Sequence, residues 1–88
     1  MHDGPWRVFY TKEALKDRER VIERGWGEKI RSIERALREN PYAPPGEKLV
    51  GEFKEAYSKR INRQHRVVYQ ILEEDRAVKV VSAWSHYE

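Results

Sequence analysis

The stretch from Ser58 to Tyr69 limits the fold more than any other part of the chain, because a strand pattern and a basic cluster coincide in it. Strand-forming side chains flank a central turn sequence, Asn62-Arg63-Gln64. Period-two alternation divides the second arm into two sets of side chains: Arg66, Val68 and Gln70 on one face, and Val67, Tyr69 and Ile71 on the other. The stretch therefore predicts a β-hairpin with Val67 facing the core and Arg66 facing away from it.

This hairpin is basic and contains no acidic residue; its cations are Lys59, Arg60, Arg63 and Arg66. One interpretation is structural, because charges along an edge strand protect a sheet against aggregation. The other is functional, because a local basic cluster can bind the phosphates of a nucleic acid. The formal net charge of the whole chain is only +3, so the functional interpretation depends on the clustering and not on the overall charge.

Length and composition favour one globular domain over residues 1–88. Charged residues make up 38% of the chain and hydrophobic residues 39%, which suits a small core under a densely charged surface. The absence of cysteine excludes disulfides and a thiol nucleophile, and three scattered histidines predict neither a metal site nor a cofactor. Without an apolar run of membrane length or a signal peptide, we expect a cytoplasmic protein that does not contact a membrane.

The N-terminal half predicts a strand and two helices. The strand is Trp6 to Tyr10, after which Thr11 can cap a helix over Lys12–Arg24 and Gly25 can end it. A second helix runs to Glu39. Trp6, Val8 and Tyr10 should share one face of the strand, and Arg7 and Phe9 the other. The apolar stripes expected to face the core contain Ala14, Leu15, Val21 and Ile22 in the first helix and Trp26, Ile30, Ile33 and Leu37 in the second.

The C-terminal half predicts strands alone. Asn40-Pro41 ends the second helix and opens an irregular connection through Gly46. Beyond it we expect a strand over Lys48–Phe53 interrupted at Gly51, the hairpin, a turn over Glu73–Arg76, and a last strand from Ala77 to Trp84. The fold class is therefore α+β: one N-terminal strand, a two-helix hairpin on one face, and an antiparallel sheet of three to four strands with its other face open.

Three kinds of side chain near the expected sheet ends could together cleave a phosphodiester: the carboxylate of Glu47, the guanidinium groups of Arg60 and Arg66, and the imidazole of His86 beside Tyr87. A carboxylate can take a proton from a ribose 2′-hydroxyl, arginine can hold the phosphate, and histidine can protonate the leaving oxygen. Bare spacing is a weak signal for such a site, since most small domains contain these residue types.

A resemblance strengthens the functional interpretation. The run S-K-R-I-N-R-Q-H-R-V-V-Y, preceded by N-P-Y and P-G-E-K-L and followed by a chain end reading W-S-H-Y, resembles the YoeB/Txe branch of the RelE/ParE toxin superfamily. It covers residues 40–88 by motif and the start of the chain only by pattern. The resemblance implies a RelE-like fold and the toxin of a type II toxin–antitoxin module that cuts messenger RNA in the ribosomal A site.

The resemblance also implies roles for individual residues. Glu47 matches the general base, Arg66 the phosphate-binding arginine with Arg60 as a second site arginine, His86 the general acid, and Tyr87 the tyrosine that shapes the nucleotide site. The implied partners are the ribosome, messenger RNA and a cognate YefM/Axe-like antitoxin, with a homodimer as an option in this branch. Two departures are Glu88 beyond the usual terminal tyrosine and Val50 in place of a basic residue.

The remaining basic residues fit binding better than catalysis. Lys48, Lys59 and Arg63 are predicted RNA contacts, because a backbone phosphate requires only positive charge and reach. His65 precedes Arg66 and should face the other way, as a structural histidine. The competing function is a non-catalytic inhibitor, as in the superfamily branch that poisons DNA gyrase; such proteins generally lack the set formed by Glu47 and the terminal His-Tyr.

Overall fold

The computed structural model describes residues 5–43, 47–48 and 56–86, and at Glu47, Ser85 and His86 it describes the backbone. The elements in chain order are β1 (Arg7–Tyr10), α1 (Lys12–Val21), the π-helical turn η1 (Ile22–Trp26), α2 (Gly27–Glu39), β2 (Glu47–Lys48), β3 (Ala56–Arg60), β4 (His65–Leu72) and β5 (Ala77–His86). Within these described residues, no helix combines the length and apolar character needed to cross a bilayer.

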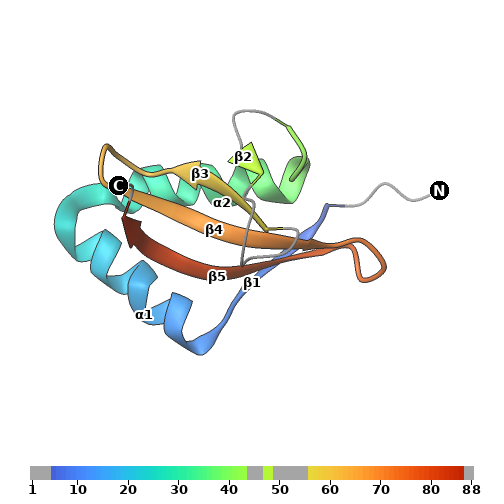
Figure 1. Ribbon diagram of the computed structural model, residues 1–88, viewed down its shortest axis with the longest axis horizontal. Coiled ribbons are helices and arrows are strands. Elements are labelled where there is room, and N and C mark those ends of the chain that lie inside the picture. Colours follow the sequence, from blue (N-terminus) through green and yellow to red (C-terminus); the bar gives the residue numbers. More distant parts are fainter. Residues whose placement is uncertain (1–4, 44–46, 49–55, 87–88) are drawn as a thin grey trace.

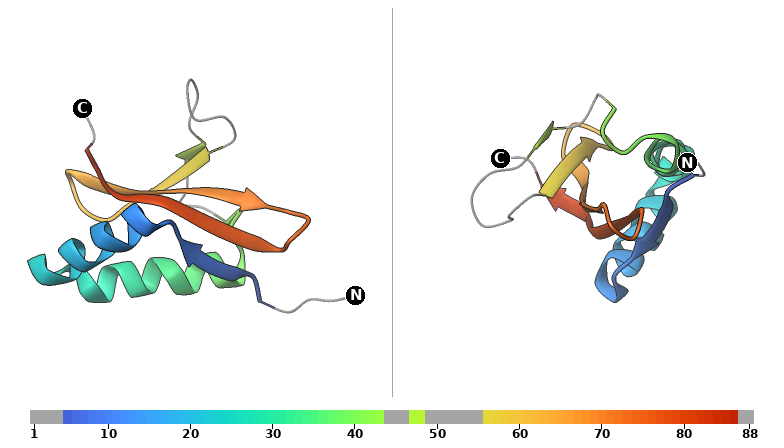
Figure 2. Two further views of the ribbon diagram at one scale, coloured as in Figure 1. Left: turned by 90° about the horizontal axis from the view of Figure 1, so that it is seen from below. Right: turned by 90° about the vertical axis from the view of Figure 1, so that its right-hand side faces the viewer.

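The strands form one five-stranded sheet in the order β1-β5-β4-β3-β2 (Figure 1). The β2–β3, β3–β4 and β4–β5 pairs are antiparallel, whereas β1 lies parallel to β5. Both helices pack on one face of the sheet, and among the residues that the structure describes no helix covers the other face, called the helix-free face below (Figure 2). The predicted α+β class with its helical pair on one face is confirmed, and the parallel β1–β5 pairing adds a neighbour relation that the sequence pattern did not reveal.

Local geometry confirms the predicted start of α1 and the predicted end of α2, whereas α1 ends at Val21, before the predicted Arg24, and the π-helical turn η1 follows it. Thr11 has an extended backbone and its Oγ1 accepts a hydrogen bond from the Ala14 amide at 3.0 Å, so it is the N-cap of α1. Gly25 adopts φ 95°, a left-handed conformation that glycine reaches at little steric cost, and the chain changes direction there before α2. The backbone of Asn40 is extended and ends α2 ahead of Pro41.

The core contains most of the predicted apolar side chains, with two exceptions. Ile30, Ile33 and Leu37 of α2 are buried. Leu15 and Trp26 were predicted to face the core, and these predictions are wrong, because their side chains are 48% and 41% exposed. The buried residues of α1 are spaced seven apart, Ala14 and Val21, so Leu15 is rotated away from that stripe. Trp26 follows the left-handed Gly25, which places it outside the regular stripe of α2.

The predicted hairpin is confirmed. Its turn is closed by Asn62, whose Oδ1 accepts hydrogen bonds from the amides of Gln64 at 2.8 Å and His65 at 2.9 Å. Val67 and Tyr69 belong to the buried core cluster, as the alternation predicted. The predicted 73–76 turn is also present, with the Arg76 amide bonded to the Glu73 carbonyl at 3.1 Å.

Two irregularities shift the register between β4 and β5. Tyr69 lies opposite Val80, but Val68 lies opposite Ser82 and Arg66 opposite Ser85, so β5 contributes one extra residue at each of two steps. A regular continuation from Tyr69 would have placed Ala83 opposite Arg66. The bulges therefore bring the chain two residues further toward its C-terminus at the position of Arg66.

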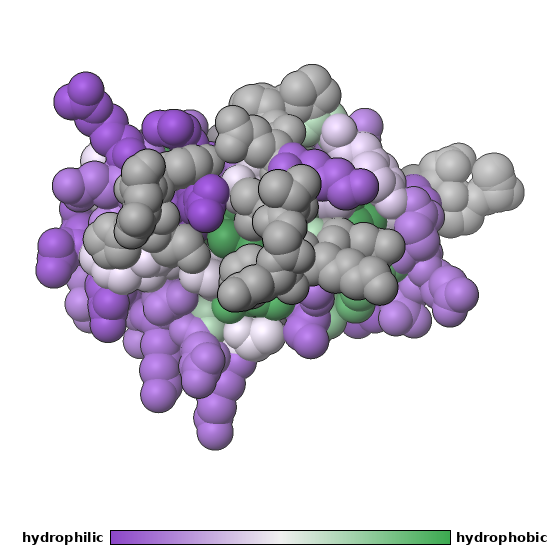
Figure 3. Space-filling model, in the orientation of Figure 1, coloured by the Kyte–Doolittle hydropathy of each residue, from purple (hydrophilic) through white to green (hydrophobic). Residues whose placement is uncertain are grey.

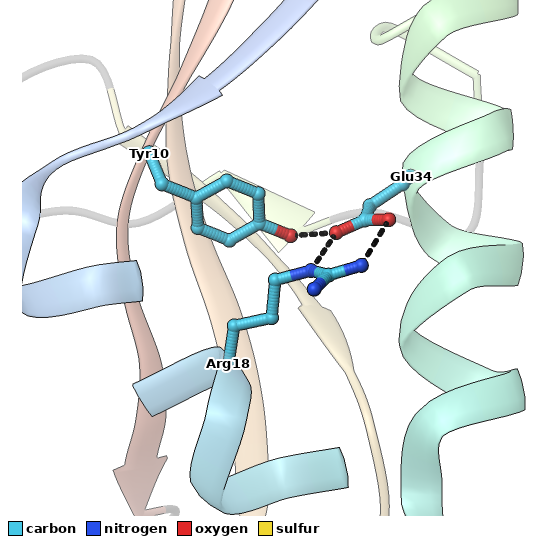
Figure 4. Close-up of polar contacts among 3 residues, drawn as sticks. All are labelled: Tyr10, Arg18 and Glu34. Carbon is cyan, nitrogen blue, oxygen red and sulfur yellow. Dashed lines mark hydrogen bonds and ion pairs between the residues drawn. The ribbon is translucent and has the colours of Figure 1, made fainter. Parts of the chain in front are cut away.

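A buried ionic cluster ties β1 to both helices (Figure 4). Glu34 accepts hydrogen bonds from Arg18 Nε at 2.6 Å and from Arg18 Nη2 at 3.3 Å, and the Tyr10 hydroxyl donates to the same carboxylate. Burial by itself would raise the pKa of Glu34, but these hydrogen bonds outweigh it and hold the pKa below its usual value. Burial and the bond to Glu34 raise the pKa of Tyr10.

Glu34→Gln is expected to lower the free energy of unfolding at neutral pH by about 2 kcal/mol, because the substitution leaves the Arg18 guanidinium without its carboxylate. The folded-state pKa of Glu34 lies below the unfolded one, so its contribution is complete above the unfolded pKa and is lost as the pH falls through the folded value. Urea unfolding of parent and variant, with the exposed Glu39→Gln as control, should give curves that differ at neutral pH and converge in acid. Equal stabilities at neutral pH would contradict this assignment.

Candidate active site

The sheet register gathers the backbone positions of Glu47, Arg60, Arg66 and His86 toward one end of the sheet. Arg60 of β3 lies directly opposite Arg66 of β4, and Arg66 lies opposite Ser85 of β5. Directly opposed residues of antiparallel strands share a face, so the two arginine side chains belong to the same side of the sheet. Val67 belongs to the helix-side core, which assigns Arg60 and Arg66 to the side without helices.

The backbone of Glu47 lies in the next row of the same register. Glu47 is opposite Ser58, and Ser58 is opposite Val68. Ser58 lies two residues before Arg60 in β3, and Val68 lies two residues after Arg66 in β4. Two residues along a strand span about 7 Å and neighbouring strands lie about 5 Å apart. The backbone position of the predicted general base is therefore one strand and one row away from Arg60.

The chain end reaches the same row. The His86 backbone is paired with His65, next to the Arg66–Ser85 pair, through the two bulges in β5. The backbone positions of these predicted residues therefore lie near one another on four adjacent strands: Glu47 on β2, Arg60 on β3, Arg66 on β4 and His86 on β5. Tyr87, Glu88 and Val50 lie outside the described residues.

Figure 3 views the helix-free face, where apolar residues are visible in the middle and hydrophilic residues surround them. Arg66 is partly buried in β4, whereas Arg60 is exposed at the end of β3. Two cations in opposed register positions concentrate positive potential at this end of the sheet. An anion is the ligand that such a pair attracts most strongly, and a phosphate accepts hydrogen bonds from both guanidinium groups.

The three predicted RNA-binding residues occupy different environments. Arg63 is exposed in the hairpin turn, close to the Arg60–Arg66 pair. Lys48 is exposed on β2, but it lies opposite Tyr57 and so alternates with Glu47. Lys59 is only 6% exposed, and its ammonium donates to the Ala43 carbonyl at 3.1 Å. Burial lowers the pKa of Lys59.

The placement of Lys59 does not fit the prediction that it contacts RNA. Lys59 is opposite the core residue Val67, so strand alternation directs it to the helix side, away from Arg60 and Arg66. Its ammonium instead holds the connection that follows α2. The basic surface of the hairpin is therefore built by Arg60, Arg63 and Arg66.

His65 is structural, in agreement with the prediction that it faces away from Arg66. Its ring is 6% exposed and stacks on Trp84 of β5, with ring centroids 3.9 Å apart and an interplanar angle of 21°. The guanidinium carbons of Arg20 and Arg24 lie 5.1 Å and 5.5 Å from the centre of the same indole. These contacts anchor β5 just before His86.

Ser58 is a residue of this face that the sequence reasoning missed. It is 1% exposed and lies between the positions of Glu47 and Val68. The sequence contained a usable signal, because Ser58 and Arg60 have the same strand parity. A small hydroxyl residue attracts less notice than a charged one, although burial makes its hydrogen bonding more consequential.

Comparison with known proteins agrees with the fold and the motif. The sequence model of the family described as YoeB-like toxin of bacterial type II toxin-antitoxin system matches residues 10–87. A search of curated proteins gave no significant match.

Solved structures of YoeB toxins are similar over nearly their whole length. A YoeB/ParE toxin from Agrobacterium tumefaciens is 26% identical, with a TM-score of 0.83 over 92% of this chain and 99% of that one. A YoeB dimer from Staphylococcus aureus is 25% identical, with a TM-score of 0.79 over 93% and 98%. The toxin in a YoeB–YefM complex from the same organism is also 25% identical, with a TM-score of 0.77 over 93% and 98%. Because the family match spans most of the sequence, the chain belongs to the YoeB-like toxins of bacterial type II toxin–antitoxin systems.

Proposed function

We propose that this toxin is a ribosome-dependent endoribonuclease that cleaves messenger RNA by acid–base attack of a ribose 2′-hydroxyl. The observation that carries the proposal is the register that brings the backbone positions of Glu47, Arg60, Arg66 and His86 to one end of the sheet. Family membership supports the same activity. A site on the ribosome also implies a cytoplasmic protein.

The proposed reaction uses only side-chain acid–base chemistry and charge. Glu47 accepts the proton of the 2′-hydroxyl, and the resulting oxygen nucleophile attacks the adjacent phosphorus. Arg66, assisted by Arg60, holds the non-bridging oxygens on which negative charge grows. His86 donates a proton to the departing 5′-oxygen. The products are a 2′,3′-cyclic phosphate and a 5′-hydroxyl, so protons and bonds balance without a metal ion.

The remaining residues would bind and orient the RNA. Tyr87 shapes the nucleotide site in this proposal, while Arg63 and Lys48 contact backbone phosphates through charge and reach. Arg63 is well placed for this because it is exposed next to the Arg60–Arg66 pair. The ribosome would hold the messenger RNA in the orientation that the acid–base groups need for efficient attack.

The partners follow from the relatives. Structures of a YoeB–YefM complex and of a YoeB dimer exist for the Staphylococcus aureus protein, which is 25% identical. We therefore propose a YefM-like antitoxin as the cognate inhibitor and a homodimer as an assembly of the free toxin. An acidic antitoxin segment would complement the basic surface formed by Arg60, Arg63 and Arg66.

The test is primer extension on a translated message incubated with purified protein, with and without ribosomes. We expect cleavage only when ribosomes are present, and fragment ends carrying a cyclic phosphate and a 5′-hydroxyl. Fragments with 5′-phosphates would refute the proposed chemistry. Growth arrest with an intact message would instead favour inhibition by binding, as in the gyrase-poisoning branch.

A further inference from the structure

One of the two bulges in β5 lies directly before the chain end, and we call it the C-terminal bulge. It begins after Ser82, which lies opposite Val68, and it ends at Ser85, which lies opposite Arg66. Over this step β4 contributes one residue and β5 contributes two. Because a bulge interrupts the regular ladder, contacts from outside the strand pair can fix its position. Contacts that hold the C-terminal bulge therefore fix which residue of the chain end lies opposite Arg66.

Ala83 is the first of the two β5 residues in the C-terminal bulge, and its backbone is bonded to α1. The Ala83 amide donates a hydrogen bond to Oδ2 of Asp17 at 3.1 Å. Ala83 is fully buried, and a buried backbone amide without an acceptor is strongly unfavourable. Bonds from a backbone amide to a carboxylate are among the stronger hydrogen bonds. Asp17 therefore supplies an acceptor from α1 at the point where the ladder is irregular.

Trp84 is the second residue of the C-terminal bulge, and the same helical segment contacts it. Arg20 and Arg24 follow Asp17 by three and seven residues, spacings that place side chains on one face of a helix. Their guanidinium carbons lie 5.1 Å and 5.5 Å from the centre of the Trp84 indole, which also stacks on His65. These ring contacts act on a side chain, whereas the Asp17 bond is made to the β5 backbone, where the register is set.

We propose that Asp17 is a positioning residue: its carboxylate holds the C-terminal bulge and thereby keeps Ser85 opposite Arg66 and the chain end beside the candidate active site. A ladder that continued regularly from Ser82 would place Trp84 opposite Arg66 and turn the side chains that follow to the opposite faces. The effect on cleavage rests on the function proposed above, whereas the effect on the register does not. In this role Asp17 does not touch the reacting atoms.

The first measurement follows the register by NMR and needs no activity. Cross-strand contacts between Arg66 and Ser85, and exchange of the Ala83 amide, are compared in the parent, Asp17→Ala and Asp17→Asn, with the exposed Glu19→Ala as control. Asp17→Ala should lose the Arg66–Ser85 contacts and speed exchange of the Ala83 amide about tenfold, the usual contribution of one hydrogen bond. Asp17→Asn keeps an acceptor oxygen and should keep the parental register. Unchanged contacts in Asp17→Ala, or an equal loss in Glu19→Ala, overturn the proposal.

Thermal unfolding separates positioning from a purely structural role. Asp17→Ala should remain folded, with a thermal midpoint lower by about 4–8 °C. A purely structural residue would lower the midpoint and leave the register unchanged. If Asp17→Ala does not fold, the parent itself provides the test: a scalar coupling across the hydrogen bond, from the Ala83 amide nitrogen to the Asp17 carboxyl carbon, should be present. Its absence overturns the proposal.

Single-turnover cleavage on programmed ribosomes links the register to the proposed function. The rate of Asp17→Ala should fall about 10²-fold, as expected for a displacement of about 1 Å at the site. Asp17→Asn should retain most of the parental rate, which a loss of negative charge alone would not allow. If the chain cleaves no RNA, the NMR contacts still decide the role of Asp17. If it cleaves, and Asp17→Ala keeps both the register and the parental rate, only the Asp17 assignment fails.

Discussion

Arg66→Ala is expected to lower the rate of single-turnover cleavage on programmed ribosomes by about 10²–10³-fold, because it removes a preorganised donor to the phosphate. The fold should remain intact. Arg66 lies on the helix-free face, and its neighbours Val67 and Val68 supply the buried apolar area of this part of β4. Thermal unfolding and cleavage, measured on the same preparation, separate the two effects.

The matched control for Arg66 is Arg7→Ala. Arg7 is also a strand arginine, but it is exposed on β1 at the far edge of the sheet from β2. The control should cleave like the parent, since it removes the same charge away from the site. If Arg66→Ala cleaves at the parental rate, Arg66 does not hold the phosphate; if it unfolds, the separation of site and core on β4 is wrong.

His86→Gln is expected to lower the same rate by about 10²–10⁴-fold, the usual contribution of a general acid. The backbone of His86 is paired with His65 beside the Arg66 row, so the substitution acts next to the proposed phosphate site. Single-turnover rates across pH provide the measurement. A parental rate that falls as the pH rises, and loses this fall in His86→Gln, fits a histidine that must be protonated to act.

Truncation checks the same assignment independently. Deleting residues 86–88 should remove activity and leave a folded, antitoxin-binding protein, because Ala83 is the last residue of the buried cluster among the described side chains of β5. Deleting only Glu88 should leave cleavage near the parental rate. A His86→Gln protein within a few-fold of the parent would eliminate His86 as the acid and leave Glu47 and the arginines to account for catalysis.

The proposed site could be predicted from the sequence only in part. Arg60 and Arg66 follow from strand parity, because a period of two fixes the face of each side chain once the hairpin turn is located. Their opposition across β3 and β4 depends on the turn at Asn62, whose Asx geometry is written locally in the sequence. Lys59 carries the same charge as Arg60 and Arg66 and lies in the same hairpin. Its ammonium is bound to the carbonyl of Ala43, which lies in the loop after α2 and is far from Lys59 in sequence, so its burial could not be read from the hairpin alone.

Local chemistry also determined the element boundaries. Thr11 caps α1 through its own side chain, Gly25 turns the chain because it tolerates a positive φ, and Asn40 ends α2 ahead of a proline. Each of these effects acts over a few residues and is visible in sequence. Helix faces were less predictable, as Leu15 shows, because an apolar residue is buried only if a partner element reaches it.

What only the tertiary structure decided is the arrangement that brings the chain end to the site. The parallel pairing of β1 with β5 depends on contacts between the two ends of the chain. The two bulges in β5 move its register by two positions, from Ala83 to Ser85 opposite Arg66. The sequence by itself determined the strands, the caps and the alternation, because those depend on neighbouring residues; the register across β5 depends on packing between strands, which no local pattern encodes.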